Sequence, residues 1–139
     1  MTATDVCAID YVDHVGIAVH NLEETLCFFR EVFGAPQAEV VDIPDQGVKA
    51  CLISLGQTRL ELLEPLFPDS PVGRFLTQRG QGLHHLALHI GDVQQGIDAL
   101  GNRGLKLLDN KPRHGLSGSI AFIHPKSVYG ILTELVETS

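Results

Sequence analysis

The sequence contains an internal repeat, and a repeat constrains the fold of a chain more strongly than its composition or any single motif. Residues 13–22 read DHVGIAVHNL and residues 84–93 read HHLALHIGDV. When His14 is laid on His85, the two segments are 71 positions apart and alternate large and small residues in the same way. Ten similar residues can arise by chance, so the elements that follow each segment are the stronger test.

The same order of elements follows both segments. Apolar residues at helical spacing predict helices over 22–33 and 93–103, each after a polar capping residue and before a glycine. Three strand-like runs follow each helix, and Gly56-Gln57 forms a tight turn between the last two of the first copy. The predicted caps are Asn21 and Asp92, the terminating glycines are Gly34 and Gly104, and the predicted strands are residues 37–42, 48–55 and 58–64 in the first copy and 106–108, 119–124 and 130–137 in the second.

This order predicts an α+β fold class, in which two βαβββ modules pair into a curved mixed sheet. Module one is expected at about 11–66 and module two at about 84–139, joined by a linker at about 67–83 whose residues 70–78 form a short helix. At 139 residues the chain is expected to be a single domain. The apolar stripes expected to face the sheet are Leu22, Leu26, Phe29 and Phe33 in the first helix and Val93, Ile97 and Leu100 in the second.

The first strand of each module is predicted to present a histidine on the side away from the helix. Side chains on a strand alternate between its two faces, and the large aliphatic residues are expected to face the helix. The opposite face then carries His14 with Gly16 and Ala18 in module one, and His85 with Ala87 and His89 in module two. Small side chains beside each histidine leave room for a ligand.

Each module also carries a glutamate inside the apolar run of its last strand, Glu61 and Glu134, which are 73 positions apart. A carboxylate between large aliphatic residues is costly to bury unless it is paired or bound to a metal. Taken singly, a strand histidine is more often a hydrogen-bonded core residue, and a glutamate can lie on a solvated face. As a set of four related by the repeat, His14, Glu61, His85 and Glu134 predict a metal site.

Composition excludes several classes of function. The net charge is −7 and no run of Lys and Arg occurs, which argues against a nucleic-acid partner. No apolar run approaches the roughly 20 residues that cross a membrane, and the first 14 residues lack the pattern of a secretion signal. Cys7, Cys27 and Cys51 are odd in number and lack CxxC spacing, so they are predicted to be buried, reduced thiols of a cytoplasmic protein.

Longer motifs along nearly the whole chain carry a family resemblance. They are Asp13–Val19, Asp45–Val48, Leu60–Leu66, Asp69–Pro71, Gly82–Ala87, and His124–Ser127 followed by Gly130–Leu135. The chain resembles the vicinal oxygen chelate superfamily, which is built from paired βαβββ modules and includes glyoxalase I. Within it the closest resemblance is to the methylmalonyl-CoA epimerases, for which the His84-His85 and His124-Pro125-Lys126 segments are the discriminating ones.

The resemblance implies a glyoxalase-like fold around a metal and places the family's ligands on His14, Glu61, His85 and Glu134. It also implies a metal-dependent epimerase that interconverts (R)- and (S)-methylmalonyl-CoA through an enolate, by proton transfer at the α-carbon. Nitrogen and oxygen ligands suit Co, Ni, Zn or Mn, and the resemblance favours cobalt. Some relatives have Gln at the position of Glu61, and some carry an acid where Ala50 stands, so the second proton carrier stays open.

An epimerase needs acid/base groups on both faces of the carbon that it inverts, which makes Glu134 and Glu61 the catalytic candidates. The substrate-binding candidates are Lys126, Ser127, Gln46 and Arg113, although an ordinary surface cation explains Arg113 equally well. The expected partner is an acyl-CoA small molecule, in a homodimer without nucleic acid or membrane contacts.

Three other functions use a similar fold. A glyoxalase I-type lactoylglutathione lyase would use the same four ligands on a glutathione hemithioacetal, ordinarily with an acidic residue where Pro125-Lys126-Ser127 stands. A metal-free, drug-sequestering protein has no need of the four ligands. A ring-cleaving dioxygenase would bind iron through two histidines and one carboxylate and is usually longer.

Overall fold

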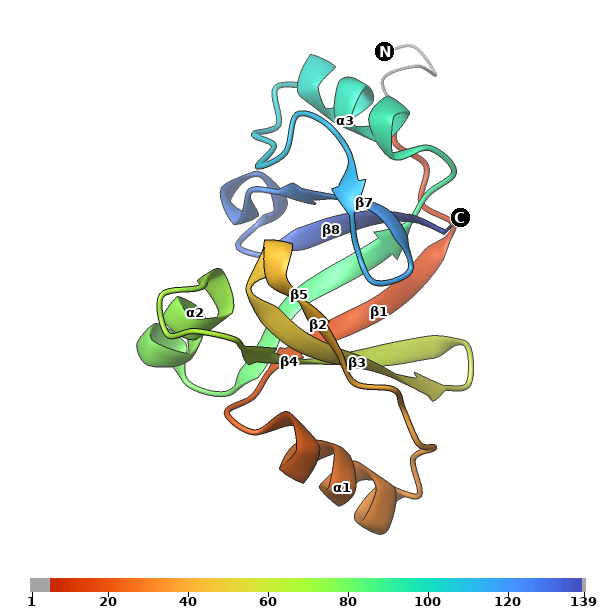
Figure 1. The fold of residues 1–139 in the computed structure, drawn as a ribbon. Coiled ribbons are helices and arrows are strands. Elements are labelled where there is room, and N and C mark those ends of the chain that lie inside the picture. The colour runs from red at the N-terminus through yellow and green to blue at the C-terminus, as the bar shows by residue number, and fades with distance from the viewer. Residues whose placement is uncertain (1–5, 139) are drawn as a thin grey trace. The chain divides into compact units, whose positions relative to one another are not determined.

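The structure is a computed structural model that describes residues 6–138. Residues 1–5, which belong to the segment predicted to lack a secretion signal, and residue 139 lie outside the described residues. The elements are β1 (Tyr11–Ala18), α1 (Leu22–Phe33), β2 (Val41–Ile43), a 3-10 turn (Pro44–Gln46), β3 (Val48–Leu55), β4 (Thr58–Pro65), α2 (Pro71–Arg79), β5 (Gly82–His89), α3 (Val93–Asn102), β6 (Arg113–His114), β7 (Gly118–Ile123), a second 3-10 turn (Pro125–Val128) and β8 (Thr133–Thr138) (Figure 1).

Each module forms a mixed four-stranded sheet with the same topology. In module one the order is β2-β3-β4-β1, with β1 parallel to β4 and the other pairs antiparallel. In module two the order is β5-β8-β7-β6, with β5 parallel to β8 and the other pairs antiparallel. The predicted βαβββ repeat is therefore present in both halves of the chain.

The chain separates into two compact units that differ slightly from the predicted modules. One unit runs from His14 to His84, and the other combines residues 6–13 with residues 85–138. The N-terminal segment is held to the second unit by the Asp10 backbone N–H, which donates to the His89 carbonyl at 2.9 Å. Each unit has its own core. That the two units form one domain over 1–139 remains a prediction.

Local hydrogen bonds define the start of each crossover helix as predicted. The side chain of Asn21 accepts from the Glu24 N–H at 2.9 Å, and that of Asp92 accepts from the Gln95 N–H at 3.0 Å. Such caps satisfy backbone donors that the first helical turn leaves free. α1 ends at Gly34, whose left-handed backbone suits a residue without a side chain.

Each crossover helix packs on its own sheet. Leu22 and Leu26 of α1 pack with Ile53 of β3 and Leu62 of β4, and Val93 and Ile97 of α3 occupy the same role against β7 and β8. The core of each unit therefore lies between one helix and one sheet face, and Figure 1 shows the two helices, α1 and α3, in the ribbon.

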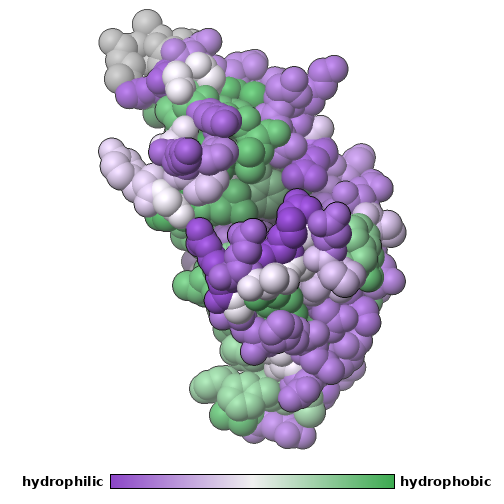
Figure 2. Space-filling model, turned by 90° about the vertical axis from the view of Figure 1, so that its left-hand side faces the viewer, coloured by the Kyte–Doolittle hydropathy of each residue, from purple (hydrophilic) through white to green (hydrophobic). Residues whose placement is uncertain are grey.

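The predicted apolar stripe of α1 is wrong at its last residue. Phe33 is 67% exposed and packs against Phe28 and Phe29 of the same helix, with ring centroids 5.7 and 5.5 Å away. Because the helix stops at Phe33, the ring has no sheet residue to cover it. Figure 2 shows apolar surface at its lower end, where Figure 1 places α1, and the exposed large apolar residues of this helix are Phe28, Val32 and Phe33.

Three strand predictions also need correction. β2 covers Val41–Ile43 and not residues 37–42, and β8 begins at Thr133 and not at residue 130. The strand predicted at 106–108 is reduced to an isolated bridge between Leu107 and Ile123, and the short edge strand Arg113–His114 pairs with β7 in its place. Short edge segments have weak patterning, so the pairing partner decides where they begin.

The linker contains the predicted short helix, α2. Ser70 caps it by accepting from the Gly73 N–H at 3.0 Å, and Pro71 occupies the first turn. Gly73 has no room for a side chain, since a Cβ there would meet the Pro68 carbonyl oxygen. No helix in residues 6–138 is long and apolar enough to span a membrane.

The prediction that all three thiols are buried is wrong for Cys27. Cys27 is exposed on α1, Cys7 is partly buried and Cys51 is buried, and all three are free. Burial raises the pKa of the Cys51 thiol to about 11. The pKa of Cys27 is also raised, first by a hydrogen bond to the Glu31 carboxylate and then by the charge of that group.

We expect a thiol reagent at neutral pH to modify Cys27 first and Cys51 only when the protein unfolds. The thiolate is the reactive form, so a raised pKa slows modification and a higher pH speeds it. Replacing Glu31 by Gln removes the carboxylate that raises the Cys27 pKa and should speed labelling of Cys27, whereas Glu24→Gln should not. Peptide mass spectrometry against time checks both, and rapid labelling of Cys51 in the folded protein would contradict this account.

Candidate functional site

Module one brings a histidine and a glutamate together inside its sheet. The parallel pairing of β1 and β4 sets Gly16 opposite Glu61, two residues after His14. The His14 Nε2 and Glu61 Oε1 atoms lie 3.5 Å apart, and the two residues are 3% and 6% exposed. Glycine, the smallest residue, is therefore the neighbour of this buried carboxylate on the adjacent strand.

Module two repeats this arrangement. The parallel pairing of β5 and β8 sets Ala87 opposite Glu134, two residues after His85. The His85 Nε2 and Glu134 Oε1 atoms again lie 3.5 Å apart, and both residues are buried. The imidazole of His85 also makes a T-shaped contact with the Phe122 ring, with centroids 5.5 Å apart. The two units therefore contain one His–Glu pair each, at equivalent positions of the repeat.

The geometry of each pair fits two ligands of one metal ion. Imidazole nitrogens and carboxylate oxygens bind first-row divalent metals at about 2.1 Å, so two ligand atoms on one ion are at most about 4.2 Å apart. The separation of 3.5 Å in each module falls within that limit. His14, His85 and Glu134 are each buried and each offer one atom able to ligate a metal. The donor chemistry of both pairs suits a divalent cation.

The substrate-binding residues predicted from the motifs differ in their surroundings. Gln46 ends the 3-10 turn that precedes β3. Arg113 makes an ion pair with Asp109, with Nε to Oδ1 at 3.1 Å, and its guanidinium lies over the Phe122 ring. Lys126 is exposed on the turn between β7 and β8.

Ser127 has a role within the fold that the sequence did not predict. Its hydroxyl accepts from the Lys106 backbone N–H at 2.8 Å, and its own N–H donates to the His124 carbonyl at 2.9 Å. The hydroxyl therefore ties the turn to the segment that follows α3. Its predicted contact with substrate remains a prediction.

Sequence reasoning missed a second pair of glutamates with equivalent roles. The Glu64 carboxylate accepts from the Leu22 N–H at 2.8 Å, and the Glu137 carboxylate accepts from the Val93 N–H at 2.9 Å. Each is the third residue after Glu61 or Glu134, so the repeat itself was a signal for them. A negative charge at a helix N-terminus is favourable, and here it fixes each crossover helix to the strand that carries the buried glutamate.

His89 also has a structural role within the second unit. Its Nδ1 lies 2.9 Å from the Asp10 carboxylate and its Nε2 lies 3.2 Å from the Thr138 hydroxyl. The ring stacks on Tyr11 with centroids 4.6 Å apart. These contacts join the N-terminal segment to the two strands β5 and β8.

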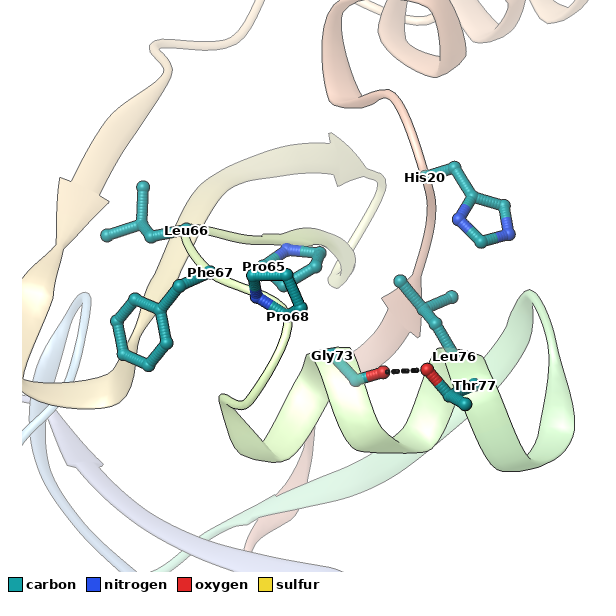
Figure 3. Close-up of a pocket in the computed structure, with 8 residues that line it drawn as sticks. All are labelled: His20, Pro65, Leu66, Phe67, Pro68, Gly73, Leu76 and Thr77. Carbon is teal, nitrogen blue, oxygen red and sulfur yellow. Dashed lines mark hydrogen bonds between the residues drawn. The ribbon is translucent and has the colours of Figure 1, made fainter.

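A cavity of about 300 Å³ lies in the first unit, away from the His14–Glu61 pair. Its walls are the end of β4 with the following loop, the helix α2 and His20. In Figure 3, Leu76 points from α2 toward the segment that carries His20, and the Thr77 hydroxyl donates to the Gly73 carbonyl at 3.1 Å. Neither His14 nor Glu61 lines it, and its walls offer one titratable group, so it brings no set of catalytic groups together.

Comparison with known proteins places this geometry in a family. Residues 13–122 match the glyoxalase/bleomycin resistance protein/dioxygenase superfamily, which is more than half of the chain. The chain belongs to this superfamily. The family predicted from the motifs is thereby confirmed at the level of the superfamily.

Comparison with individual relatives shows to which family within the superfamily the chain belongs. The chain is 39% identical to the uncharacterized protein YqjC of Bacillus subtilis over 127 residues, and this match covers 91% of each chain. It is 36% identical over 130 residues to the ethylmalonyl-CoA/methylmalonyl-CoA epimerase of Cereibacter sphaeroides, covering 91% of this chain and 97% of the relative. A solved methylmalonyl-CoA epimerase in complex with methylmalonyl-CoA and NH4+ is 35% identical, with a TM-score of 0.91 over 95% of this chain and 96% of that one. The chain is thus a member of the epimerase family, and both the enzyme class and the glyoxalase-like fold class are confirmed.

We expect His14→Ala and His85→Ala each to lower sharply the metal content of the purified protein. Each change removes one buried nitrogen ligand and leaves Glu61 or Glu134 without its partner. Elemental analysis after a chelator wash measures the metal, and circular dichroism checks the fold. His20→Ala, at an exposed position, is the matched control. Full metal content in either variant would show that the pair does not ligate.

Proposed function

We propose that this chain is a metal-dependent epimerase that interconverts (R)- and (S)-methylmalonyl-CoA through an enolate, by proton transfer at the α-carbon. The observation that carries the proposal is the equivalent buried His–Glu pair in each module, at 3.5 Å in both. Relatives that cover nearly the whole chain and are named as epimerases of acyl-CoA thioesters support the choice of substrate.

We assign the metal to His14, Glu61, His85 and Glu134, two ligands from each module. A divalent ion there supplies a Lewis acid that stabilises negative charge on the thioester oxygen of the enolate. The donor set is compatible with Co, Ni, Zn or Mn, and we propose cobalt by family resemblance.

The glutamates have a second role in this proposal. Epimerisation removes the proton between a carboxylate and a thioester carbonyl and returns one to the opposite face, so a base and an acid are needed on the two faces. Glu134 and Glu61 come from equivalent positions of the two modules and are the groups proposed to exchange these protons. Ala50, fully buried on β3, stands where some relatives carry an acid, and an alanine side chain cannot transfer a proton.

The same proposal assigns the residues that contact the substrate and the working form of the protein. The residues proposed to contact the acyl-CoA are Lys126, Ser127, Gln46 and Arg113. Arg113 already forms an ion pair with Asp109, so Lys126 is the cation with fewer competing contacts. We propose a homodimer in the cytoplasm as the working form. The alternatives, a lactoylglutathione lyase and a metal-free binding protein, share the fold and are separated from an epimerase by substrate.

We expect metal-loaded protein in deuterated water to place deuterium on the α-carbon of (R)- or (S)-methylmalonyl-CoA and to yield both enantiomers. It should act on this thioester with a higher kcat/KM than on the methylglyoxal–glutathione adduct. Mass spectrometry and chiral analysis measure the first, and steady-state kinetics the second. A kcat/KM on the glutathione adduct equal to or above that on the thioester would assign the chain to the lyases, and binding without turnover of either would assign it to the binding proteins.

We expect Glu134→Gln and Glu61→Gln each to allow α-proton exchange for one enantiomer without inversion. The amide keeps an oxygen that can bind a metal but cannot carry the proton, and loss of one acid/base group reduces turnover about 10²–10⁴-fold. Deuterium exchange and chiral analysis of the same sample separate exchange from inversion.

The matched controls for these variants are Glu64→Gln and Glu137→Gln. Each lies three residues further along the same strand, where the amide oxygen can still accept the helix N–H. Both should epimerise at close to the unmutated rate. If Glu134→Gln and Glu61→Gln do so as well with metal bound, the two-carboxylate mechanism is wrong.

A further inference from the structure

The turn between β7 and β8 holds a tyrosine in an unfavourable backbone conformation. Tyr129 has φ 54° and ψ 36°, and it is the one non-glycine residue with positive φ in residues 6–138. A left-handed backbone costs a residue with a side chain about 1–2 kcal/mol. The turn enforces it, because the Gly130 N–H donates to the Pro125 carbonyl at 2.7 Å and the Ile131 N–H to the Val128 carbonyl at 3.0 Å.

The side chain of Tyr129 makes no contact within residues 6–138 that would offset this backbone strain. It is 99% exposed, and no ring contact or hydrogen bond of its side chain is found among the described residues. Tyr11, by contrast, stacks on His89. Glycine would satisfy the same turn without strain, so packing does not account for an aromatic residue here. Strained, exposed residues of this kind are concentrated at sites that bind ligands.

The stretch of sequence that leads into this turn is rich in positive charge, and two of its lysines lie at the turn. Residues 103–126 contain five of the ten Lys and Arg residues but one of the 17 Asp and Glu residues, in a chain of net charge −7. Lys106 lies beside the turn, since its N–H donates to Ser127 and its carbonyl accepts from the His124 N–H at 2.9 Å. Lys106 and Lys126 are exposed, and neither has an ion-pair partner in the described part of the chain.

An open aromatic ring beside unpaired cations is the chemistry that recognises a nucleotide. The base stacks on the ring, and the phosphates attract the ammonium groups. We propose that Tyr129 stacks on the adenine of the coenzyme A thioester, with Lys106 and Lys126 beside its phosphates. This rests on the proposed function in taking coenzyme A as the acyl carrier. Glu134 lies five positions after Tyr129, a span of at most about 17 Å, so one extended ligand can contact both.

We expect Tyr129→Gly to weaken binding of adenosine 3′,5′-bisphosphate at least about fivefold by calorimetry, from the loss of base stacking. Tyr129→Phe keeps the ring and should bind within about twofold of the unmutated protein. Lys106→Ala and Lys126→Ala should each weaken binding of the bisphosphate and reduce the dependence of that binding on salt concentration. Arg79 is a cation on α2, and Arg79→Ala should change neither. The melting temperature of Tyr129→Gly should not fall, because glycine relieves the backbone strain.

In turnover, Tyr129→Gly should lower by a similar factor the preference for methylmalonyl-CoA over methylmalonyl-pantetheine, which lacks the nucleotide. Equal binding of the bisphosphate by Tyr129→Gly and the unmutated protein would overturn the proposal, as would absence of binding by the unmutated protein. If the bisphosphate binds through Tyr129 but no thioester is epimerised, the proposed reaction fails and the nucleotide site stands. If both thioesters turn over with an unchanged preference, the reaction stands and the nucleotide site fails.

Discussion

A carboxylate buried beside an imidazole is the constraint on which each half of this protein depends. Glu61 and Glu134 stand within apolar strands, and a buried charge without a partner destabilises a fold by several kcal/mol. Each is placed 3.5 Å from a histidine of the module's first strand. In the strand register the small residues Gly16 and Ala87 lie opposite the two carboxylates.

The parallel pairing that joins each histidine to its glutamate explains the remaining topology. Parallel neighbours need a long crossover, which the helix and the following strands of each module provide. The same last strand then holds the crossover helix in place, since Glu64 and Glu137 accept the first N–H groups of α1 and α3. One strand therefore carries both the buried acid of the candidate site and the acid that positions the helix, which explains why the two features recur together.

Duplication of a module suits a reaction at a carbon that must be approached from two faces. In the proposed reaction the two equivalent His–Glu pairs would supply equivalent bases, whereas the features that select a substrate need no symmetry. The turn after β7 has no counterpart in module one, where Gly56 occupies the tight turn between β3 and β4. Recognition of a nucleotide by Tyr129 and its neighbouring lysines would thus be confined to one module, while the proposed chemistry draws on both.

The sequence by itself determined the repeat, the bounds of α1 and β3, the helix caps and the identity of the four His and Glu residues. These depend on interactions over a few residues, such as the Asn21 cap, or on side-chain alternation along one strand. Tertiary structure decided the edge strands β2 and β6, the exposure of Phe33 and the roles of Glu64 and Ser127. The hydrogen bonds of Glu64 and Ser127 join residues 42 and 21 positions apart, and an edge strand forms where its partner offers free backbone groups, so neither leaves a local pattern in the sequence.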